Sequence, residues 1–228
     1  TVNLKIQDFK SAIRAAHEQG IIERNVGAPV KALPSIDSEI RAAFEPLEIE
    51  TLMSRAKPDW KGAILIAAHT GLRLSNITEL DWRDVNVSRG EFTVKPVKQR
   101  RGQRAVLIVP MSASVQAYFH RLEESKTGPV FPSLAGRKAA GHSTTFANLM
   151  KSAGIPKEIE LPGGDKGTRS FHSLRHFYVS SMANADVPAD VRRTLSAHKS
   201  ADVHAIYTHH DRQTLDRAVA TLPDLRVS

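Results

Sequence analysis

One segment of this chain has a spacing of apolar residues that differs from the rest, and this difference limits the folds that the chain can adopt. In residues 91–110, Phe92 and Val94 alternate with polar residues, and Val106, Ile108 and Pro110 follow beyond a basic segment that contains Gly102. Two such apolar stretches on either side of a short basic turn predict a β-hairpin with a charged tip. Because this is the only strong strand signal, we expect a mainly α-helical fold with a small antiparallel β-sheet.

Elsewhere, apolar residues recur at steps of three and four, which predicts helices. We expect these helices at residues 46–56, 58–70, 74–83, 112–124, 143–153, 172–184, 188–197, 200–209 and 211–222. Gly71 and Gly154 act as stop signals, whereas Ser143, Ser200 and Asp211 are suited to begin a helix. Residues 155–170 are rich in Gly and Pro and are expected to form a loop.

The N-terminal region predicts one more amphipathic helix, at residues 4–19, ended by Gly20. Residues 25–38 contain Gly and Pro with little periodicity and are typical of a linker. A single helix before a linker buries no core, so it must pack on the rest of the chain or on a preceding segment.

Composition narrows the class of protein. The 228 residues suit one domain of ordinary size, and 41% of them are hydrophobic. A net charge of +8 predicts an acidic partner, most commonly nucleic acid. Cysteine is absent, which excludes disulfides, thiol catalysis and Cys-type zinc sites here. No apolar run approaches a membrane span and no signal peptide is visible, so we expect a soluble cytoplasmic protein.

The segment HSLRH (172–176) raises the possibility of a zinc site. His172 and His176 are four residues apart and share a helix face. However, Ser173 stands where a metalloprotease has Glu, and no acidic third ligand lies nearby in the sequence. We therefore predict no metal.

Other polar residues look ordinary when taken singly. Arg73 follows a helix stop and resembles a surface arginine, and Lys98 resembles a solvated hairpin charge. Tyr207 has the spacing of a half-buried tyrosine on a helix that begins at Ser200. The histidines around it in HAIYTHH (204–210) are typical of a helix face or helix end.

Together, however, the order Arg, hairpin Lys, His-x-x-Arg, His, Tyr resembles the tyrosine recombinases, also called the phage integrase family. The resemblance is carried by TGLR (70–73), HSLRH (172–176) and LSAHKSADVHAIYTHHD (195–211). It implies the DNA breaking–rejoining enzyme fold. By the same resemblance, residues 34–228 are the catalytic domain, and residues 1–33 are the last helix and linker of a mostly absent N-terminal core-binding domain.

The resemblance implies a site-specific recombinase or integrase that cleaves and rejoins double-stranded DNA through a 3′-phosphotyrosine intermediate, without metal, ATP or cofactor. Arg73 and Arg175 match the pair that holds the scissile phosphate. His172 matches the residue that assists proton transfer, and His198 one that hydrogen-bonds the phosphate. Tyr207 matches the nucleophile.

The family supplies the proton for the leaving 5′-oxygen from a hairpin lysine. Lys98 is the predicted residue and Lys95 the alternative, because this hairpin is longer than usual. The basic residues Lys95, Arg100, Arg101 and Arg104 are predicted to contact the DNA backbone.

Two departures from the family pattern and several alternatives stay open. Asn76 stands where the family usually has an acidic residue, and LSAH replaces LGH. A type IB topoisomerase, a telomere resolvase or a catalytically inactive DNA-binding module remain alternatives. The resemblance implies a bacterial or phage-encoded, nucleoid-associated protein that forms a tetramer on DNA. The C-terminal helix (211–222) is expected to dock either on its own chain or on a neighbouring subunit.

Overall fold

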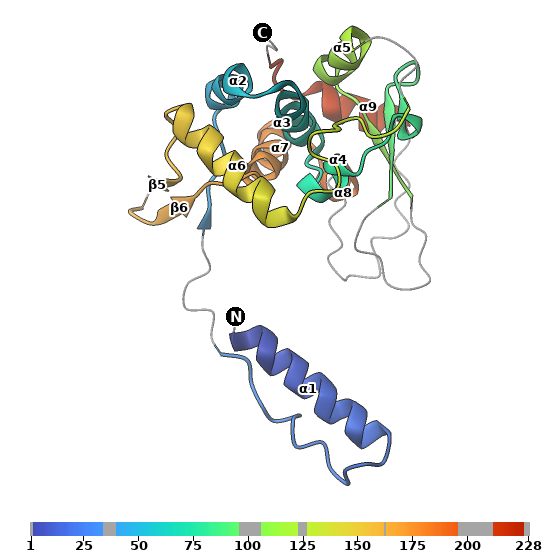
Figure 1. The fold of residues 1–228 in the computed structure, drawn as a ribbon, viewed down its shortest axis with the longest axis vertical. Coiled ribbons are helices and arrows are strands. Elements are labelled where there is room, and N and C mark those ends of the chain that lie inside the picture. The colour runs from blue at the N-terminus through green and yellow to red at the C-terminus, as the bar shows by residue number, and fades with distance from the viewer. Residues whose placement is uncertain are drawn as a thin grey trace. The chain divides into compact units, whose positions relative to one another are not determined.

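The computed structural model describes residues 2–33, 40–95, 106–122, 127–161, 163–195 and 212–225. The chain divides into two compact units, residues 1–39 and residues 40–228. Figure 1 shows both units. Within the described ranges, no helix has the length and apolar character needed to cross a membrane.

The N-terminal unit is built on one helix, α1 (Val2–Glu18), in agreement with the prediction. The following segment folds back along α1. Leu33 N–H donates to Asn3 Oδ1 at 2.8 Å, and Lys10 Nζ donates to the carbonyl oxygen of Val30 at 2.6 Å. No residue of α1 is buried, and Phe9 is 50% exposed. As expected for a single helix, this unit buries no core of its own.

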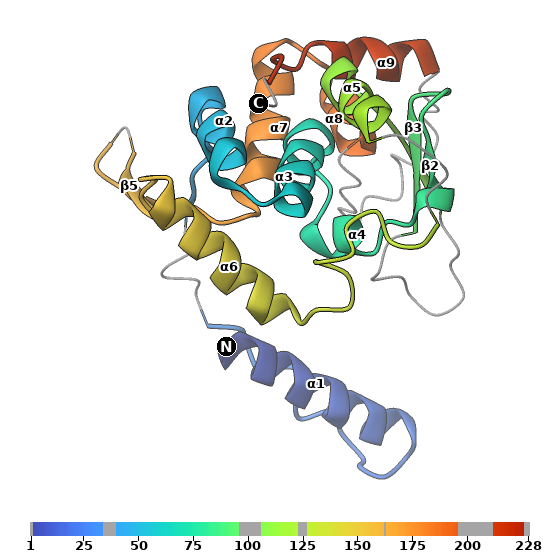
Figure 2. The same ribbon diagram turned by 45° about the horizontal axis from the view of Figure 1, so that its top comes forward.

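The second unit is mainly helical. Its helices are α2 (Pro46–Arg55), α3 (Pro58–Thr70), α4 (Leu74–Thr78), α5 (Ala113–Arg121), α6 (Ala139–Ser152), α7 (Ser173–Asn184), α8 (Ala189–Leu195) and α9 (Arg212–Ala220). In Figures 1 and 2, α3 lies among the other helices, and it packs against α2, α4, α5 and α7. Every residue from Gly62 to Thr70 is buried, so α3 is the centre of the core.

Two predicted helix boundaries are wrong. The predicted helix 74–83 ends at Thr78, and a short 3-10 helix, η1 (Trp82–Asp84), follows it. Asp81 causes this break, because its side chain accepts a hydrogen bond from Arg83 N–H and starts η1. The helix α6 begins at Ala139, four residues before the predicted start at Ser143, whose hydroxyl donates to the Ala139 carbonyl within the helix.

The predicted hairpin is confirmed. β3 (Glu91–Val94) and β4 (Leu107–Pro110) pair antiparallel, with Phe92 opposite Val109, and both of these side chains are buried. β2 (Val85–Asn86) adds a third antiparallel strand on the other side of β3. The basic tip, residues 96–105, lies outside the described residues.

A second small sheet corrects the prediction of a loop at residues 155–170. β5 (Glu158–Glu160) pairs antiparallel with β6 (Lys166–Thr168), and β6 pairs parallel with β1 (Ile40–Arg41). Strands of two or three residues are too short to show a period of two in the sequence. Moreover, β1 comes from the far end of the unit, so no local pattern indicates the pairing.

The C-terminal helix packs on its own chain. Ala218, Val219 and Leu222 are buried in a cluster with residues of α7 and α8. Beyond the helix, Leu225 enters the main core, and Ser114 donates a hydrogen bond to Asp224. In both views α9 (red) lies beside α5. Three residues of the apolar stripe predicted for this helix, Ala218, Val219 and Leu222, therefore pack within one chain in this structure.

Candidate active site

The first part of the site lies at the corner between α3 and α4. Gly71 ends α3 in the left-handed conformation, with φ +62°, and its N–H donates to the Ala67 carbonyl oxygen at 2.9 Å. Leu72 is buried, and the next residue, Arg73, is exposed at the start of α4. The tight turn therefore brings Arg73 to the surface beside the buried end of α3.

The second part lies on the first turn of α7, which packs against α3. Ser173 holds this turn, since its hydroxyl oxygen accepts a hydrogen bond from Ser170 N–H at 3.1 Å. Arg175 is only 3% exposed, and its Nη1 donates to the Gly71 carbonyl oxygen at 2.6 Å. This bond brings Arg175 to the corner that carries Arg73.

Arg175 has further hydrogen-bond donors. Its Nε and Nη2 are buried and find no hydrogen-bond partner among the described residues. Burial, followed by the charge of Arg73, lowers the pKa of Arg175 to about 10, so the guanidinium is still charged at pH 7. A buried charged fork beside a second arginine is suited to an anion with several oxygens, such as a phosphate.

Two histidines stand on either side of Arg175 along the chain. The rings of His172 and His176 lie 5.4 Å apart, edge to face. Burial first, and then neighbouring positive charges, lower the pKa of His172 to about 4. Those charges belong to His176, Arg175, Arg73 and Arg41. The pKa of His176 is also lowered, mainly by burial. Both rings are therefore neutral at pH 7 and can accept a proton or a hydrogen bond.

The same histidine pair has the spacing of a zinc site. Among the described residues, no third His, Asp or Glu joins them in a group that could hold a metal ion. The charges that act on the pKa of His172 are all positive, and positive charges repel a metal cation. The residues present are thus better suited to an anion than to a metal.

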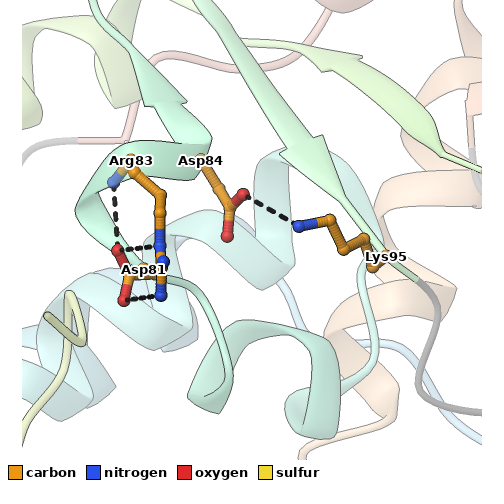
Figure 3. Close-up of polar contacts among 4 residues, drawn as sticks. All are labelled: Asp81, Arg83, Asp84 and Lys95. Carbon is orange, nitrogen blue, oxygen red and sulfur yellow. Dashed lines mark hydrogen bonds and ion pairs between the residues drawn. The ribbon is translucent and has the colours of Figure 1, made fainter.

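The hairpin begins on the other side of α4. Lys95 Nζ lies 3.8 Å from Asp84 Oδ1, and Arg83 Nε lies 3.0 Å from Asp81 Oδ1 (Figure 3). A cleft of about 550 Å³ opens between α4 and β3, and Asn76 and Lys95 both line it. Asn76 is largely buried, one turn after Arg73. The base of the hairpin therefore faces the helix that Arg73 begins.

The structure brings together three of the predicted site residues, Arg73, His172 and Arg175, and it places Lys95 at the hairpin base. The other predicted site residues, Lys98, Arg100, Arg101, Arg104, His198 and Tyr207, lie outside the described residues. The roles assigned to them stay predictions.

The structure also adds two residues that the sequence did not indicate as part of the site. Arg41 Nη1 lies 3.4 Å from Ser170 Oγ, directly before the α7 turn. The sequence suggests His176 only as a metal ligand, but its neutral ring lies 5.4 Å from that of His172, next to the arginines of the site. No local sequence signal points to Arg41, because its position depends on the pairing of β1 with β6, more than a hundred residues later.

Comparisons with known proteins identify the family and the fold. The model of the phage integrase family matches residues 43–214. The integrase of Salmonella phage P22 is 23% identical over 203 residues, which are 88% of this chain and 51% of that protein. The tyrosine recombinase XerA of Pyrococcus furiosus is 22% identical over 223 residues, covering 96% of this chain and 73% of that protein.

A solved structure shares the fold. A lambda integrase tetramer bound to a Holliday junction aligns with a TM-score of 0.63 and 20% identity, covering 92% of this chain and 60% of that chain. The chain spans about half the length of the P22 integrase that it matches. The family model matches most of the chain, from the segment between β1 and α2 to the start of α9. This chain therefore belongs to the phage integrase family.

Proposed function

We propose that this chain is the catalytic part of a site-specific DNA recombinase or integrase, which cleaves and rejoins strands through a 3′-phosphotyrosine intermediate. The observation that carries the proposal is the hydrogen bond from Arg175 to the Gly71 carbonyl oxygen. That bond brings Arg175 to the corner that carries Arg73, with two buried guanidinium donors that find no partner among the described residues.

Phosphodiester cleavage needs this arrangement because negative charge grows on the non-bridging oxygens in the transition state. Two guanidinium groups, held in place before the reaction, stabilise that charge without reorganisation. Arg73 is exposed, whereas Arg175 is buried and anchored at Gly71, two residues before Arg73, so we propose that both guanidinium groups bind the same phosphate. Membership in the family supports the assignment.

The remaining steps involve His172 together with Tyr207, Lys98 and His198, and the last three lie outside the described part of the chain. The phenolic oxygen of Tyr207 attacks phosphorus, and the bond from phosphorus to the 5′-oxygen breaks. His172, neutral at pH 7, accepts the phenolic proton, and Lys98 gives a proton to the leaving 5′-oxygen. His198 donates a hydrogen bond to the phosphate. A 5′-hydroxyl then gives its proton back to Lys98 and attacks phosphorus, the bond from phosphorus to Tyr207 breaks, and His172 returns the proton to the phenolic oxygen.

We assign the proton donor to Lys98 rather than Lys95. Lys95 forms an ion pair with Asp84 at the base of the hairpin, as Figure 3 shows. This ion pair orients the Lys95 ammonium group toward Asp84, which leaves Lys98, further along the hairpin sequence, as the proposed proton donor. Lys95, Arg100, Arg101 and Arg104 are instead proposed to contact DNA phosphates, in keeping with the net charge of +8.

We further propose that the protein acts as a tetramer on DNA and that residues 1–33 continue into an N-terminal domain that also contacts DNA. The structural relative from lambda is a tetramer on a Holliday junction, which supports the first point. The N-terminal unit supports the second, since several of its apolar side chains, including Phe9, are exposed. In such a tetramer, α9 is proposed to leave its own chain and dock on a neighbour.

The test uses a library of nicked DNA duplexes with a randomised centre, because the target site is not specified by these residues. A nick just 3′ of the cleavage point lets the short product diffuse away and traps the covalent adduct. We expect the strand labelled at its 5′ end to become attached to protein, with Tyr207 as the modified residue by peptide mass spectrometry. The Tyr207→Phe variant should give no adduct.

An adduct that persists in Tyr207→Phe contradicts the assignment of the nucleophile. Retained DNA binding without any adduct from the unaltered chain points instead to an inactive DNA-binding protein. Efficient relaxation of supercoiled plasmids lacking the recovered site points to a type IB topoisomerase.

A further inference from the structure

Arg41 is held beside the α7 turn by backbone pairing. Arg41 lies opposite Thr168 in the β1–β6 pair, and Ala42 N–H donates to the Thr168 carbonyl oxygen at 2.9 Å. Ala42 and Phe44 are buried, which fixes the register, whereas Arg41 is exposed. The chain reaches Ser170, the hydrogen-bond partner of Arg41, two residues after Thr168. The position of Arg41 is therefore part of the fold.

The positive charges around the turn form two groups. After burial, the pKa of His176 is lowered first by Arg41 and then by Arg175, and Arg73 does not contribute. For His172 the order is reversed, with Arg175 and Arg73 ahead of Arg41. The hydrogen bonds agree with this division, since Arg175 is anchored at the Gly71 carbonyl next to Arg73, whereas Arg41 is anchored at Ser170, before the α7 turn.

We propose that Arg41, together with His176, binds a second DNA phosphate, next to the phosphate held by Arg73 and Arg175. This inference rests on the proposed function. A DNA strand presents its phosphates in series, so two adjoining cationic groups on one turn match two consecutive phosphates. A guanidinium binds phosphate oxygens in a bidentate manner, and a neutral imidazole can donate one hydrogen bond.

This second contact has a definite role in the reaction. Phosphate contacts fix the position of a protein along DNA without reading its sequence. Arg41 is a binding residue that sets which phosphate reaches Arg175, and it does not touch the reacting atoms. Its loss should weaken binding while leaving the chemical step nearly intact once DNA is saturating.

The test compares Arg41→Gln with Arg55→Gln, a matched loss of one charge at an exposed arginine at the end of α2. Binding of the nicked duplex library is measured over a range of salt concentrations. Arg41→Gln should reduce the slope of log affinity against log salt by about 1, the value for one lost phosphate contact. Arg55→Gln should leave the slope unchanged.

Two further measurements separate the possible roles. The rate of adduct formation by Arg41→Gln at saturating DNA should stay within about threefold of the unaltered chain. His176→Phe should weaken binding without changing the salt slope, because a neutral imidazole releases no counterion.

The outcomes are distinguishable. A salt slope equal to that of Arg55→Gln overturns the contact. A fall in adduct formation of about a hundredfold at saturating DNA, with an unchanged slope, assigns Arg41 to the scissile phosphate and overturns the second site. If the unaltered chain binds DNA but forms no adduct, the proposed function fails, and a changed slope still supports the Arg41 contact.

Discussion

At the scale of single residues, Arg175 combines a structural and a chemical task. One nitrogen holds the Gly71 carbonyl oxygen, and two others are buried without a partner in the described part of the chain. A buried cation with unused donors costs stability. That cost is offset when an anion binds, so under the proposed function the donors of Arg175 are already in place for a phosphate.

This double task predicts the effect of Arg175→Lys. A single ammonium keeps the charge but cannot hold the Gly71 carbonyl and bind two phosphate oxygens at once. We expect adduct formation to fall about 10²- to 10³-fold, with DNA affinity changed about threefold or less. The control is Arg192→Lys, since Arg192 Nε also donates to a backbone carbonyl, that of Val187, on a different helix. Equal rates for the two variants would argue against a phosphate role for Arg175.

His69 gives a second prediction at this scale. It is 1% exposed near the end of α3, its Nδ1 lies 2.8 Å from Ser112 Oγ, and burial lowers its pKa to about 4. Between about pH 6.5 and pH 4, the His69 ring is protonated in the unfolded chain but neutral in the folded chain, because the pKa of His69 is lowered only on folding. Stability is therefore full above about pH 6.5 and declines as the pH falls toward 4.

The measurement is urea unfolding at pH 7.5 and pH 5. From pH 7.5 to pH 5, we expect the free energy of unfolding to fall by about 2 kcal/mol more in the unaltered chain than in His69→Asn. This value follows from the difference between the ordinary and the folded-state pKa of His69. The asparagine can retain the contact with Ser112, and the other histidines are common to both proteins. Equal losses would show that His69 titrates normally in the folded state.

At the scale of elements, the corner between α3 and α4 depends on Gly71. A Cβ at this position would meet Tyr178 Cδ1 at 2.6 Å, and the left-handed backbone adds strain. We expect Gly71→Ala to lower the free energy of unfolding by about 2–5 kcal/mol and to slow adduct formation. The control is Gly154→Ala, which has φ +71° and no atom within 4 Å of the added Cβ, and should cost about 1–2 kcal/mol.

The elements also show which parts of the fold a sequence reveals. The helix α3 and the β3–β4 hairpin were predictable because their apolar residues repeat over a full element. The end of α4 was not, because the side chain of Asp81 competes with the helix for backbone donors. The β1–β6 pairing was not predictable either, because both strands are very short and lie more than a hundred residues apart in the sequence. Arg41 was missed for the same reason.

The same contrast holds for the candidate site. Arg73 and Arg175 were predicted from their order in the chain, and the packing of α3 on α7 brings their segments together. Neither the hydrogen bond from Arg175 to Gly71 nor the loss of charge on His172 was foreseeable. Both depend on burial, which arises only when distant helices pack.

At the scale of the whole molecule, the packing of α9 governs how one chain relates to others. Val219 is 3% exposed in the cluster that α9 shares with α7 and α8. An apolar stripe that is already covered is not available to a partner, so the free chain should be a monomer of 25.1 kDa. Any exchange of α9 between subunits must first break this contact, and DNA-driven assembly has to supply the free energy.

Val219→Ser tests this arrangement against its exposed neighbour, Ala220→Ser. We expect Val219→Ser to lower the free energy of unfolding by about 2 kcal/mol, and Ala220→Ser by about 0.5 kcal/mol or less. Because the helix docks within one chain, the loss should not vary with protein concentration, and light scattering should show monomers for both variants. A loss that shrinks as the protein is concentrated, or a dimer mass for the free chain, would place α9 on a neighbouring subunit before DNA binds.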